Sequence, residues 1–408
     1  MSKYDVVLDY IKANWEKSVY KDEEGTGFMG VDLPYRYTCP SIKDEGHFSF
    51  FFYWDTYFTN LGLLTDGHSD VAKENIMNMM WFIKRQGFMP NHVGLYNRSQ
   101  SPYLCRMVRD YINRTGDDSM YEEWAYGLKQ EYYFWANARF TPIGLNHYAY
   151  QDTAENCAEF YDMISNRMGF DKDIPVDQKA EIGGHFLANA EATCDFSNRF
   201  NYRCLDYVEV DLNALLYEYE EYLLECSKNL GWKEESVWEE RMIRRKELIN
   251  KYMWNDQAGL FYDYDFVNKN FSPVPALTGL QVMSSGIATK EQAESMKNNL
   301  DLFEREYGIA YTPETSDCRK FQWAYPAVWP PMVYMTVEGL LKYGYEDDAK
   351  RIAVKYLDTT LRLFEETGKL WEKTDAETGS VYNAEYNAAA MLGWTAGIFV
   401  YLCSIFFK

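Results

Sequence analysis

Apolar residues recur every three or four positions through most long segments of this chain, and the alternation of every second residue that marks a β-strand is scarce. The clearest case is residues 210–231, whose apolar stripe comprises Leu212, Leu215, Leu216, Tyr219, Leu223 and Cys226. Gly231 closes that segment, and glycine commonly follows the last turn of a helix. This pattern restricts the chain to a predominantly helical fold.

The same periodicity predicts further helices at residues 234–252, 349–363 and 388–406. The aromatic stretches between helices carry proline and glycine and are predicted to be loops; they span residues 24–60, 88–104, 141–160, 254–277 and 311–331. Residues 259–266 have the character of a short strand within one loop. No flexible linker or charge block interrupts the chain, so we expect one domain, residues 1–408. The alternation favours a barrel of helical hairpins whose inner helices face a central cleft.

Charge and aromatic content narrow the choice of ligand. The formal net charge of −21 would repel phosphate, which argues against a nucleic-acid partner and against an anionic membrane. Aromatic residues make up 17% of the chain. They either pack the core or, in part, line a carbohydrate cleft where rings stack on sugar faces, and composition does not separate these two interpretations.

Several sequence patterns bear on cofactors and location. The eight cysteines form no CxxC pair and the five histidines form no HxH or HExxH spacing, so we expect no metal and no cofactor. The charged, amphipathic N-terminus has no apolar signal core, which predicts a cytoplasmic protein. The uncharged stretch from Ala388 to Phe407 is long enough to cross a bilayer, but it also suits a buried inner helix, which we expect instead. The sequence gives no indication of oligomeric state.

Cleavage of a glycosidic bond requires one carboxylic acid to protonate the leaving oxygen and a second carboxylate to activate water or attack carbon. The acids that lie in aromatic, mostly uncharged surroundings are Asp55, Glu191, Asp195, Glu372 and Glu385. Such surroundings favour functional over solvated carboxylates. Asp55 and Asp195 could instead cap helices, and Glu372 could be a loop charge paired with Lys373. The residues alone therefore give a shortlist of acids without roles.

Motifs along the chain add a resemblance to this shortlist. The runs in question are FFYWDTYFTNLGLL (51–64), NRSQSPYL (97–104), EATCDFSNRF (191–200), VEVDLNALLY (208–217), WNDQAGLFYDYD (254–265), FQWAYPAVWPP (321–331), LWEKTD (370–375) and EYNAAAMLGWT (385–395). In this order they resemble the conserved segments of the trehalases of glycoside hydrolase family 37 and of their relatives, the family 63 α-glycosidases. The resemblance runs from about residue 28 to residue 400.

The resemblance implies an all-α (α/α)6 toroid with short strands in its loops, and hydrolysis of an α-glycoside with inversion of configuration. Asp195 would be the general acid and Glu372 the general base, with their carboxyls about 6.5–9.5 Å apart. We expect burial among rings to keep Asp195 protonated near neutral pH. The residues expected to hold the sugar are Trp54, Asp55, Asn91, Arg98, Gln100, Glu191, Gln322, Trp323, Trp329, Glu385 and Trp394.

The chain also departs from the family pattern at groups that would hold sugar hydroxyls. DEGHFSF (44–50) lacks the arginine of a PGGRF-like run, and a second arginine is missing near QDTAEN (151–156). Leu187 stands where the family has an arginine, and Cys194 where it has a tryptophan. Ala324 replaces an aspartate, and Ala327 replaces an asparagine. Both expected catalytic acids remain, so we expect an intact catalytic pair and an altered pocket on the leaving-group side.

Trehalose is therefore the default substrate, with glucose released, and three alternatives stay open. A glucosyl- or mannosylglycerate-type solute would need a cation such as Arg98, Arg106 or Arg109 for its acid. A non-catalytic sugar-binding protein is disfavoured by retention of both acids. A phosphorylase is disfavoured because the sequence has neither a glycine-rich loop nor clustered basic residues to hold phosphate.

Overall fold

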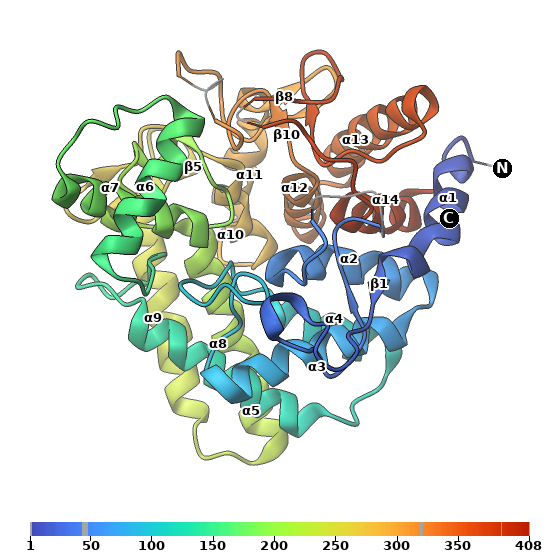
Figure 1. The fold of residues 1–408 in the computed structure, drawn as a ribbon, viewed down its shortest axis with the longest axis horizontal. Coiled ribbons are helices and arrows are strands. Elements are labelled where there is room, and N and C mark those ends of the chain that lie inside the picture. The colour runs from blue at the N-terminus through green and yellow to red at the C-terminus, as the bar shows by residue number, and fades with distance from the viewer. Residues whose placement is uncertain (1, 43–47, 318–320, 385, 408) are drawn as a thin grey trace.

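The computed structural model describes residues 2–42, 48–317, 321–384 and 386–407. Its helices alternate along the chain between an inner and an outer ring (Figure 1). Within the described residues, each inner helix packs against the next, and the last closes the ring on the first. The inner helices are α2 (Tyr53–Asp66), α4 (Leu104–Thr115), α8 (Val210–Leu230), α10 (Gln281–Ser284), α12 (Pro330–Lys342) and α14 (Gly393–Phe406).

The outer helices cover this ring from outside, and α13, for example, packs against both α12 and α14. They are α1 (Asp5–Asn14), α3 (Ser69–Gln86), α5 (Tyr121–Ala138), α9 (Glu235–Met253), α11 (Lys290–Asn298) and α13 (Glu346–Thr367). The described chain thus has the alternation of inner and outer helices that defines the predicted (α/α)6 toroid. Gly231 ends α8 in the left-handed conformation, as its sequence position predicts.

One helical hairpin interrupts the alternation between α5 and α8. It consists of α6 (Ala154–Met168) and α7 (Val176–Glu191), which pack closely against each other. Gly183 makes this approach possible, because a Cβ at that position would overlap the carbonyl group of Cys157. The chain leaves α7 towards Asp195, so the hairpin delivers the expected general acid to the ring.

The strands are two-residue antiparallel pieces in the loops. The first pairs are β1 (Val19–Tyr20) with β2 (Tyr37–Thr38), β4 (Trp254–Asn255) with β5 (Leu260–Phe261), and β8 (Glu304–Arg305) with β9 (Gly308–Ile309). A three-stranded sheet contains β3 (Tyr207–Val208), β6 (Tyr264–Asp265) and β7 (Asn270–Phe271). The remaining pair joins β10 (Ala327–Val328) to β11 (Thr374–Asp375) and so brings the segment of Glu372 beside that of Trp329. The strand character predicted for residues 259–266 corresponds to β5 and β6.

The apolar C-terminal segment is an inner helix. Eleven of the fourteen residues of α14 are buried, and α14 packs closely on α2. Gly397 meets the backbone of Phe58 there, since a Cβ on Gly397 would overlap the Phe58 carbonyl oxygen. No helix in the described part of the chain combines the length and apolarity needed to cross a membrane.

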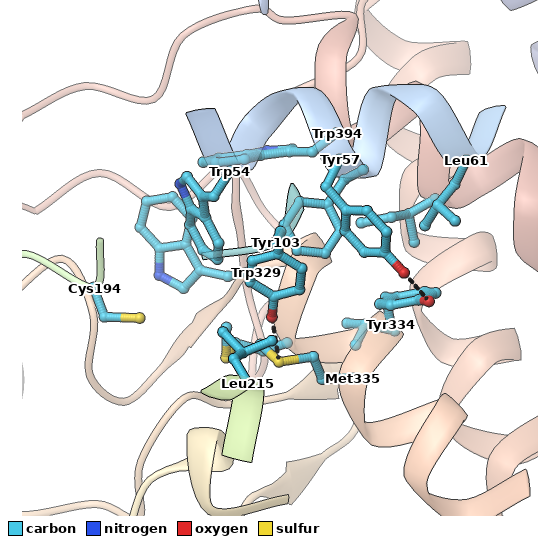
Figure 2. Packing of buried hydrophobic residues seen from close by; sticks show 14 of the residues in the cluster. Trp54, Tyr57, Leu61, Tyr103, Cys194, Leu215, Trp329, Tyr334, Met335 and Trp394 are labelled. Atoms are coloured by element: carbon cyan, nitrogen blue, oxygen red, sulfur yellow. Dashed lines mark hydrogen bonds between the residues drawn. The ribbon is translucent and has the colours of Figure 1, made fainter. Parts of the chain in front are cut away.

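Aromatic side chains fill the interior of the ring (Figure 2). Tyr103 stacks on Tyr57 with 4.9 Å between ring centroids, and the hydroxyls of Tyr57 and Tyr334 share a hydrogen bond of 2.6 Å. Tyr103 donates to Sδ of Met335 at 3.1 Å. These contacts pack the middle of the ring along its axis.

Three boundaries differ from the sequence prediction by five residues or more. The predicted loop 24–60 ends at Tyr53, where α2 begins, and the predicted loop 141–160 ends at Ala154, where α6 begins. The predicted helix 388–406 begins five residues late, at Gly393. The start of α2 is concealed because its cap is remote: the side chain of Gln100, rather than a local polar residue, accepts its first free N–H groups.

Candidate active site

A pocket of about 470 Å³, its open mouth included, lies where the inner helices begin. It is lined by Phe48, Phe52, Trp54, Asp55, Gln100, Thr193, Asp195, Trp323, Trp329, Glu372, Tyr386, Met391 and Trp394. Residues far apart in the sequence meet here because the inner helices start at the same end of the ring: Trp54 lies in the first turn of α2, Trp329 caps α12 and Trp394 lies in the first turn of α14.

Four tryptophans form one connected wall of the pocket. Trp323 and Trp329 stack almost in parallel, with centroids 3.8 Å apart and planes at 4°. Trp54 lies 5.7 Å from both Trp323 and Trp394, and Trp394 lies 5.8 Å from Trp329. All four are at most 5% exposed, so their orientations are fixed by mutual packing. Such rings present flat apolar faces to a sugar.

Asp195 reaches the pocket from the segment that follows α7. The next residue, Phe196, accepts a hydrogen bond from the backbone N–H of Trp323 at 3.2 Å, which ties this segment to the tryptophan wall. The short helix η3 (Asn198–Phe200) is capped by the side chain of Ser197. The alternative role of Asp195 as a cap is therefore not what the structure shows.

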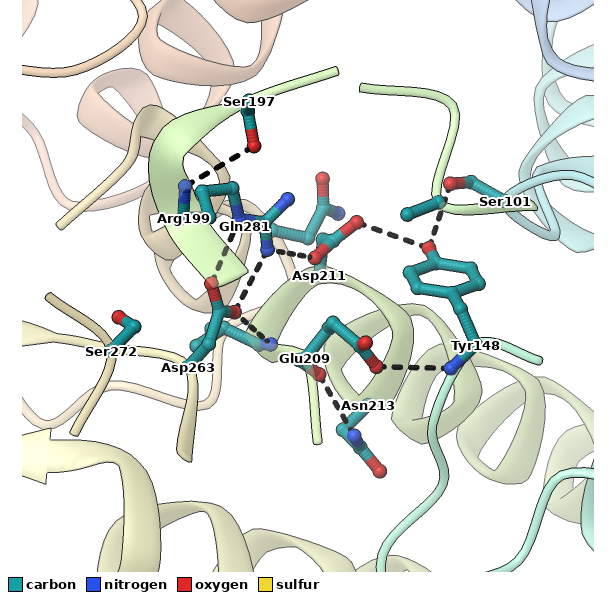
Figure 3. A network of polar contacts seen from close by, with 12 residues as sticks. Ser101, Tyr148, Ser197, Arg199, Glu209, Asp211, Asn213, Asp263, Ser272 and Gln281 are labelled. Carbon is teal, nitrogen blue, oxygen red and sulfur yellow. Dashed lines mark hydrogen bonds and ion pairs between the residues drawn. The ribbon is translucent and has the colours of Figure 1, made fainter. Parts of the chain in front are cut away.

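A buried polar network anchors the segment behind Asp195 (Figure 3). Arg199 is fully buried and binds both carboxylate oxygens of Asp263 at 2.8 Å and one oxygen of Asp211 at 2.9 Å. Tyr148 donates to the other oxygen of Asp211 at 3.0 Å. Because Asp211 lies in the first turn of α8, the network fixes the loop of the expected acid to an inner helix.

Glu372 lines the pocket and is 3% exposed. Its Oε1 accepts the hydroxyl of Tyr386 at 2.8 Å, and its Oε2 accepts Nζ of Lys373 at 2.8 Å. Its backbone carbonyl accepts the indole N–H of Trp394 at 3.1 Å. The pairing with Lys373 considered for a loop charge exists, but both partners are buried in the pocket wall rather than solvated.

Asp55 is the third carboxyl of the pocket. Burial raises its pKa from the ordinary value of 3.8 to about 8, and the negative charges of Glu372 and Asp195 add to this increase. At neutral pH Asp55 is therefore mostly protonated and can donate a hydrogen bond. It is the third residue of α2, whose cap position is Phe52, so it does not cap the helix.

Glu191 and Arg98 do not line the pocket among the described residues. Glu191 is 0% exposed, and Arg139 binds both its oxygens, at 2.8 and 2.9 Å. The backbone N–H groups of Ser99 and Ala149 also donate to it. Its carboxylate is thus directed at Arg139 and the backbone rather than at a sugar.

Arg98 lies near the acid and forms no ion pair with another described residue. Burial lowers its pKa, while the charges of Asp195 and Glu191 oppose that decrease. Its Nε has no hydrogen-bond partner within the described residues, and one terminal nitrogen binds Asn97 at 3.0 Å.

The other residues expected to bind the sugar either lie behind the pocket surface or fall outside the described residues. Asn91 is tied by its backbone to Arg98 and Tyr53. The backbone carbonyl of Gln322 accepts the indole N–H of Trp329, and its Oε1 has no partner within the described residues. Glu385 lies outside the described residues.

The sequence motifs are matched over nearly the whole chain by the family model described as "Trehalase", which covers residues 13–406. The chain belongs to the trehalase family. It is accordingly a glycoside hydrolase.

Solved structures establish the fold of this trehalase-family chain. Neutral trehalase of Saccharomyces cerevisiae superposes with a TM-score of 0.78 at 24% identity, over 98% of this chain and 79% of the yeast chain. A glycoside hydrolase family 63 mannosylglycerate hydrolase of Thermus thermophilus, in complex with glucose, gives a TM-score of 0.65 at 16% identity, over 98% of this chain and 99% of that chain. Both likenesses confirm the (α/α)6 toroid.

The positions at which this trehalase-family chain departs from the pattern lie behind the pocket. The replaced side chains are all at most 1% exposed and do not line the pocket among the described residues: Leu187, Cys194, Ala324 and Ala327. Residues 44–47 of the DEGHFSF run lie outside the described residues.

Sequence reasoning missed five residues that line the pocket: Phe48, Phe52, Thr193, Tyr386 and Met391. Tyr386 follows Glu385 directly in the EYNAAAMLGWT run, so the motif contained the signal. Phe48 precedes the FFYWDTYFTNLGLL run and Phe52 lies within it, but nothing in their spacing distinguishes them from core residues. Within the described residues, no group of three or more His, Cys, Asp or Glu side chains is arranged to hold a metal.

Proposed function

We propose that this trehalase-family hydrolase releases glucose from a small α-linked glucoside with inversion of configuration, and that trehalose is its first candidate substrate. Asp195 is the general acid and Glu372 the general base. The observation that carries the proposal is that both carboxyls line one small pocket walled by four tryptophans. The family match supports the reaction class.

In the proposed reaction Asp195 donates its proton to the glycosidic oxygen while the bond from that oxygen to the anomeric carbon breaks. Glu372 removes a proton from a water molecule, which attacks the anomeric carbon from the opposite face. The two carboxyls must leave room for this water, so we expect them about 6.5–9.5 Å apart. The products are a sugar of inverted anomeric configuration and the free leaving group.

The other pocket residues suit the binding of the sugar. A protonated Asp55 donates to a hydroxyl and adds no further negative charge beside Glu372 and Asp195. The tryptophan wall excludes water and stacks on the sugar ring. Within this wall, Trp54 and Trp394 contact each other at the start of α2. Both effects favour binding of a neutral hexose unit.

The test is hydrolysis of a panel of α-linked disaccharides and glycosylglycerates by the wild type, Asp195→Asn and Glu372→Gln. We expect wild type to turn over one substrate, with the product configuration inverted by NMR, and each variant to lose at least about 100-fold in kcat. Retention of configuration would contradict the mechanism. A wild type that is silent on the whole panel would remove the trehalose assignment.

A glycosylglycerate-type substrate is the second candidate, and Arg98 favours it. Of the three arginines considered for the acid group, Arg106 is buried against Glu218, and Arg109 contacts the same Glu218. Arg98 alone of these three is near Asp195 and carries an unpartnered nitrogen within the described residues. Preferential hydrolysis of a glycosylglycerate in the panel would select this candidate.

A further inference from the structure

Lys373 brings a positive charge into a fully buried position next to the proposed base. Its side chain is 0% exposed, and its Nζ lies 2.8 Å from Oε2 of Glu372. The same ammonium lies over two rings, 3.6 Å from the centroid of Tyr386 and 4.9 Å from that of Trp329. A buried cation is costly unless a carboxylate and aromatic faces replace its water. The surroundings of Lys373 supply both the carboxylate and the aromatic faces.

The ion pair is a product of the fold rather than of adjacency in the sequence. Successive side chains of an extended segment point to opposite faces. The segment of Glu372 is held beside its neighbours by the Trp371–Ala390 bridge and by the pairing of β10 with β11. The long Lys373 side chain nevertheless meets the preceding carboxylate, which places its charge directly on that group.

Lys373 lies behind the pocket wall. Glu372, Tyr386 and Trp329 are among the described residues that line the pocket, and Lys373 is not. Lys373 lines a separate small cavity on the other side, together with Val328. It therefore affects a bound sugar only through the residues in front of it, of which Glu372 is its ion-pair partner.

The charges around Glu372 oppose one another. Asp55 on α2 interacts electrostatically with both Glu372 and Asp195, and a negative charge on any one of these carboxyls disfavours ionisation of its neighbours. Lys373 from the same segment brings a positive charge to one oxygen of Glu372, and the hydroxyl of Tyr386 donates to the other. A pocket with three carboxyls needs such an asymmetry, because the base must be charged while the acid keeps its proton.

We propose that Lys373 is a positioning residue for Glu372: its ammonium balances the charge of that carboxylate and keeps it turned towards the water that it activates. The inference rests on the proposed role of Glu372 as general base. Lys373 is not among the described residues that line the pocket, so its effect is on the charge balance and orientation of its neighbour.

The kinetic test uses α-glucosyl fluoride, because fluoride leaves without a proton and the rate then reports on the base. In Lys373→Met we expect the acidic limb of the kcat/KM profile to move up by about 1–3 pH units. We expect kcat at pH 6 to fall at least about tenfold, with KM changed far less. Lys373→Arg should restore part of the loss, and Lys172→Met, an exposed lysine, should match wild type. An unshifted acidic limb in Lys373→Met would overturn the proposal.

A second readout does not depend on catalysis. The carboxyl signal of Glu372 is identified in protein labelled with ¹³C-glutamate by its loss in Glu372→Gln, and is then followed with pH. We expect Glu372 to stay protonated to higher pH in Lys373→Met than in wild type. Identical titrations would refute the role of Lys373 even in an active enzyme. A shifted titration in a wild type that hydrolyses no glucoside would instead refute the proposed function and leave the electrostatic role standing.

Discussion

Asp55 holds its proton more tightly in the folded chain than in the unfolded chain. Burial, together with Glu372 and Asp195, raises its pKa from 3.8 to about 8. Between these two pH values the native state retains a proton that the unfolded state has released. The free energy of unfolding therefore falls as pH rises from about 4 to about 8, and Asp55 costs stability at neutral pH.

Replacing Asp55 by asparagine should remove this cost. We expect Asp55→Asn to raise Tm by a few degrees at pH 8 and by much less at pH 5. For a chain of this size, each kcal/mol of added stability raises Tm by roughly 2–4 °C or less. Activity should fall, because the proposed contact with the sugar is altered. Thermal unfolding at both pH values checks the stability, with the exposed Asp173→Asn as the control. An equal gain at both pH values would show that ionisation of Asp55 is not the cause.

At the scale of secondary-structure elements, the close crossing of α2 and α14 positions two of the four tryptophans. Gly397 on α14 lies against the backbone of Phe58, and Gly62 on α2 lies against Gly397. With glycine at both positions the helices approach to backbone contact. Trp54 and Trp394, which precede these glycines by about two turns and one turn, then meet at the pocket.

A methyl group at this crossing should separate the helices. We expect Gly397→Ala to lower the free energy of unfolding by about 2 kcal/mol or more, because the added Cβ meets fixed backbone. Gly127→Ala on α5 is the matched control, since its Cβ would meet only the flexible Met80 side chain. That variant should change stability by no more than about 1 kcal/mol, helped by the better helix propensity of alanine. Urea unfolding of both variants measures the difference, and equal losses would contradict this account.

At the scale of the whole molecule, the buried network of Arg199 joins segments that are remote in the sequence. It connects the loop of Asp195 to Asp211 on α8 and to Asp263 between β5 and β6. All three charged side chains are buried. Removal of the cation would leave two carboxylates without their partner in a medium of low polarity, which is costlier than never having buried the set.

We expect Arg199→Met to lower the free energy of unfolding by about 3–5 kcal/mol. The double variant Arg199→Met with Asp263→Asn should recover part of this loss, because one unpaired charge is removed with it. Arg203→Met, in which a half-exposed arginine loses its contact with Asp206, should cost at most about 1 kcal/mol. Denaturant unfolding of the three proteins tests the comparison, and similar losses for Arg199 and Arg203 would argue against a buried network.

The sequence predicted the helical elements well where polar residues separate the apolar ones at helical spacing, even where those polar residues are buried. The stripe from Leu212 to Cys226 and the stop at Gly231 correspond to α8 and its end. Prediction failed at the start of α2, since its first residues are mostly aromatic and its cap is supplied by Gln100 from another segment. Periodicity needs a polar face, and local capping signals need a local cap; α2 has neither at its start.

The sequence by itself determined the fold class, the family and the shortlist of acids, because helical periodicity and collinear motifs are local properties of the chain. Only the tertiary structure decided which of these residues share a pocket. Asp55, Asp195 and Glu372 come from three distant segments, while Glu191 of the same shortlist is bound to Arg139 behind the wall. It also decided that Lys373 is a buried partner rather than a surface charge. Burial and the distance between side chains depend on how the rings close, and no local pattern encodes them.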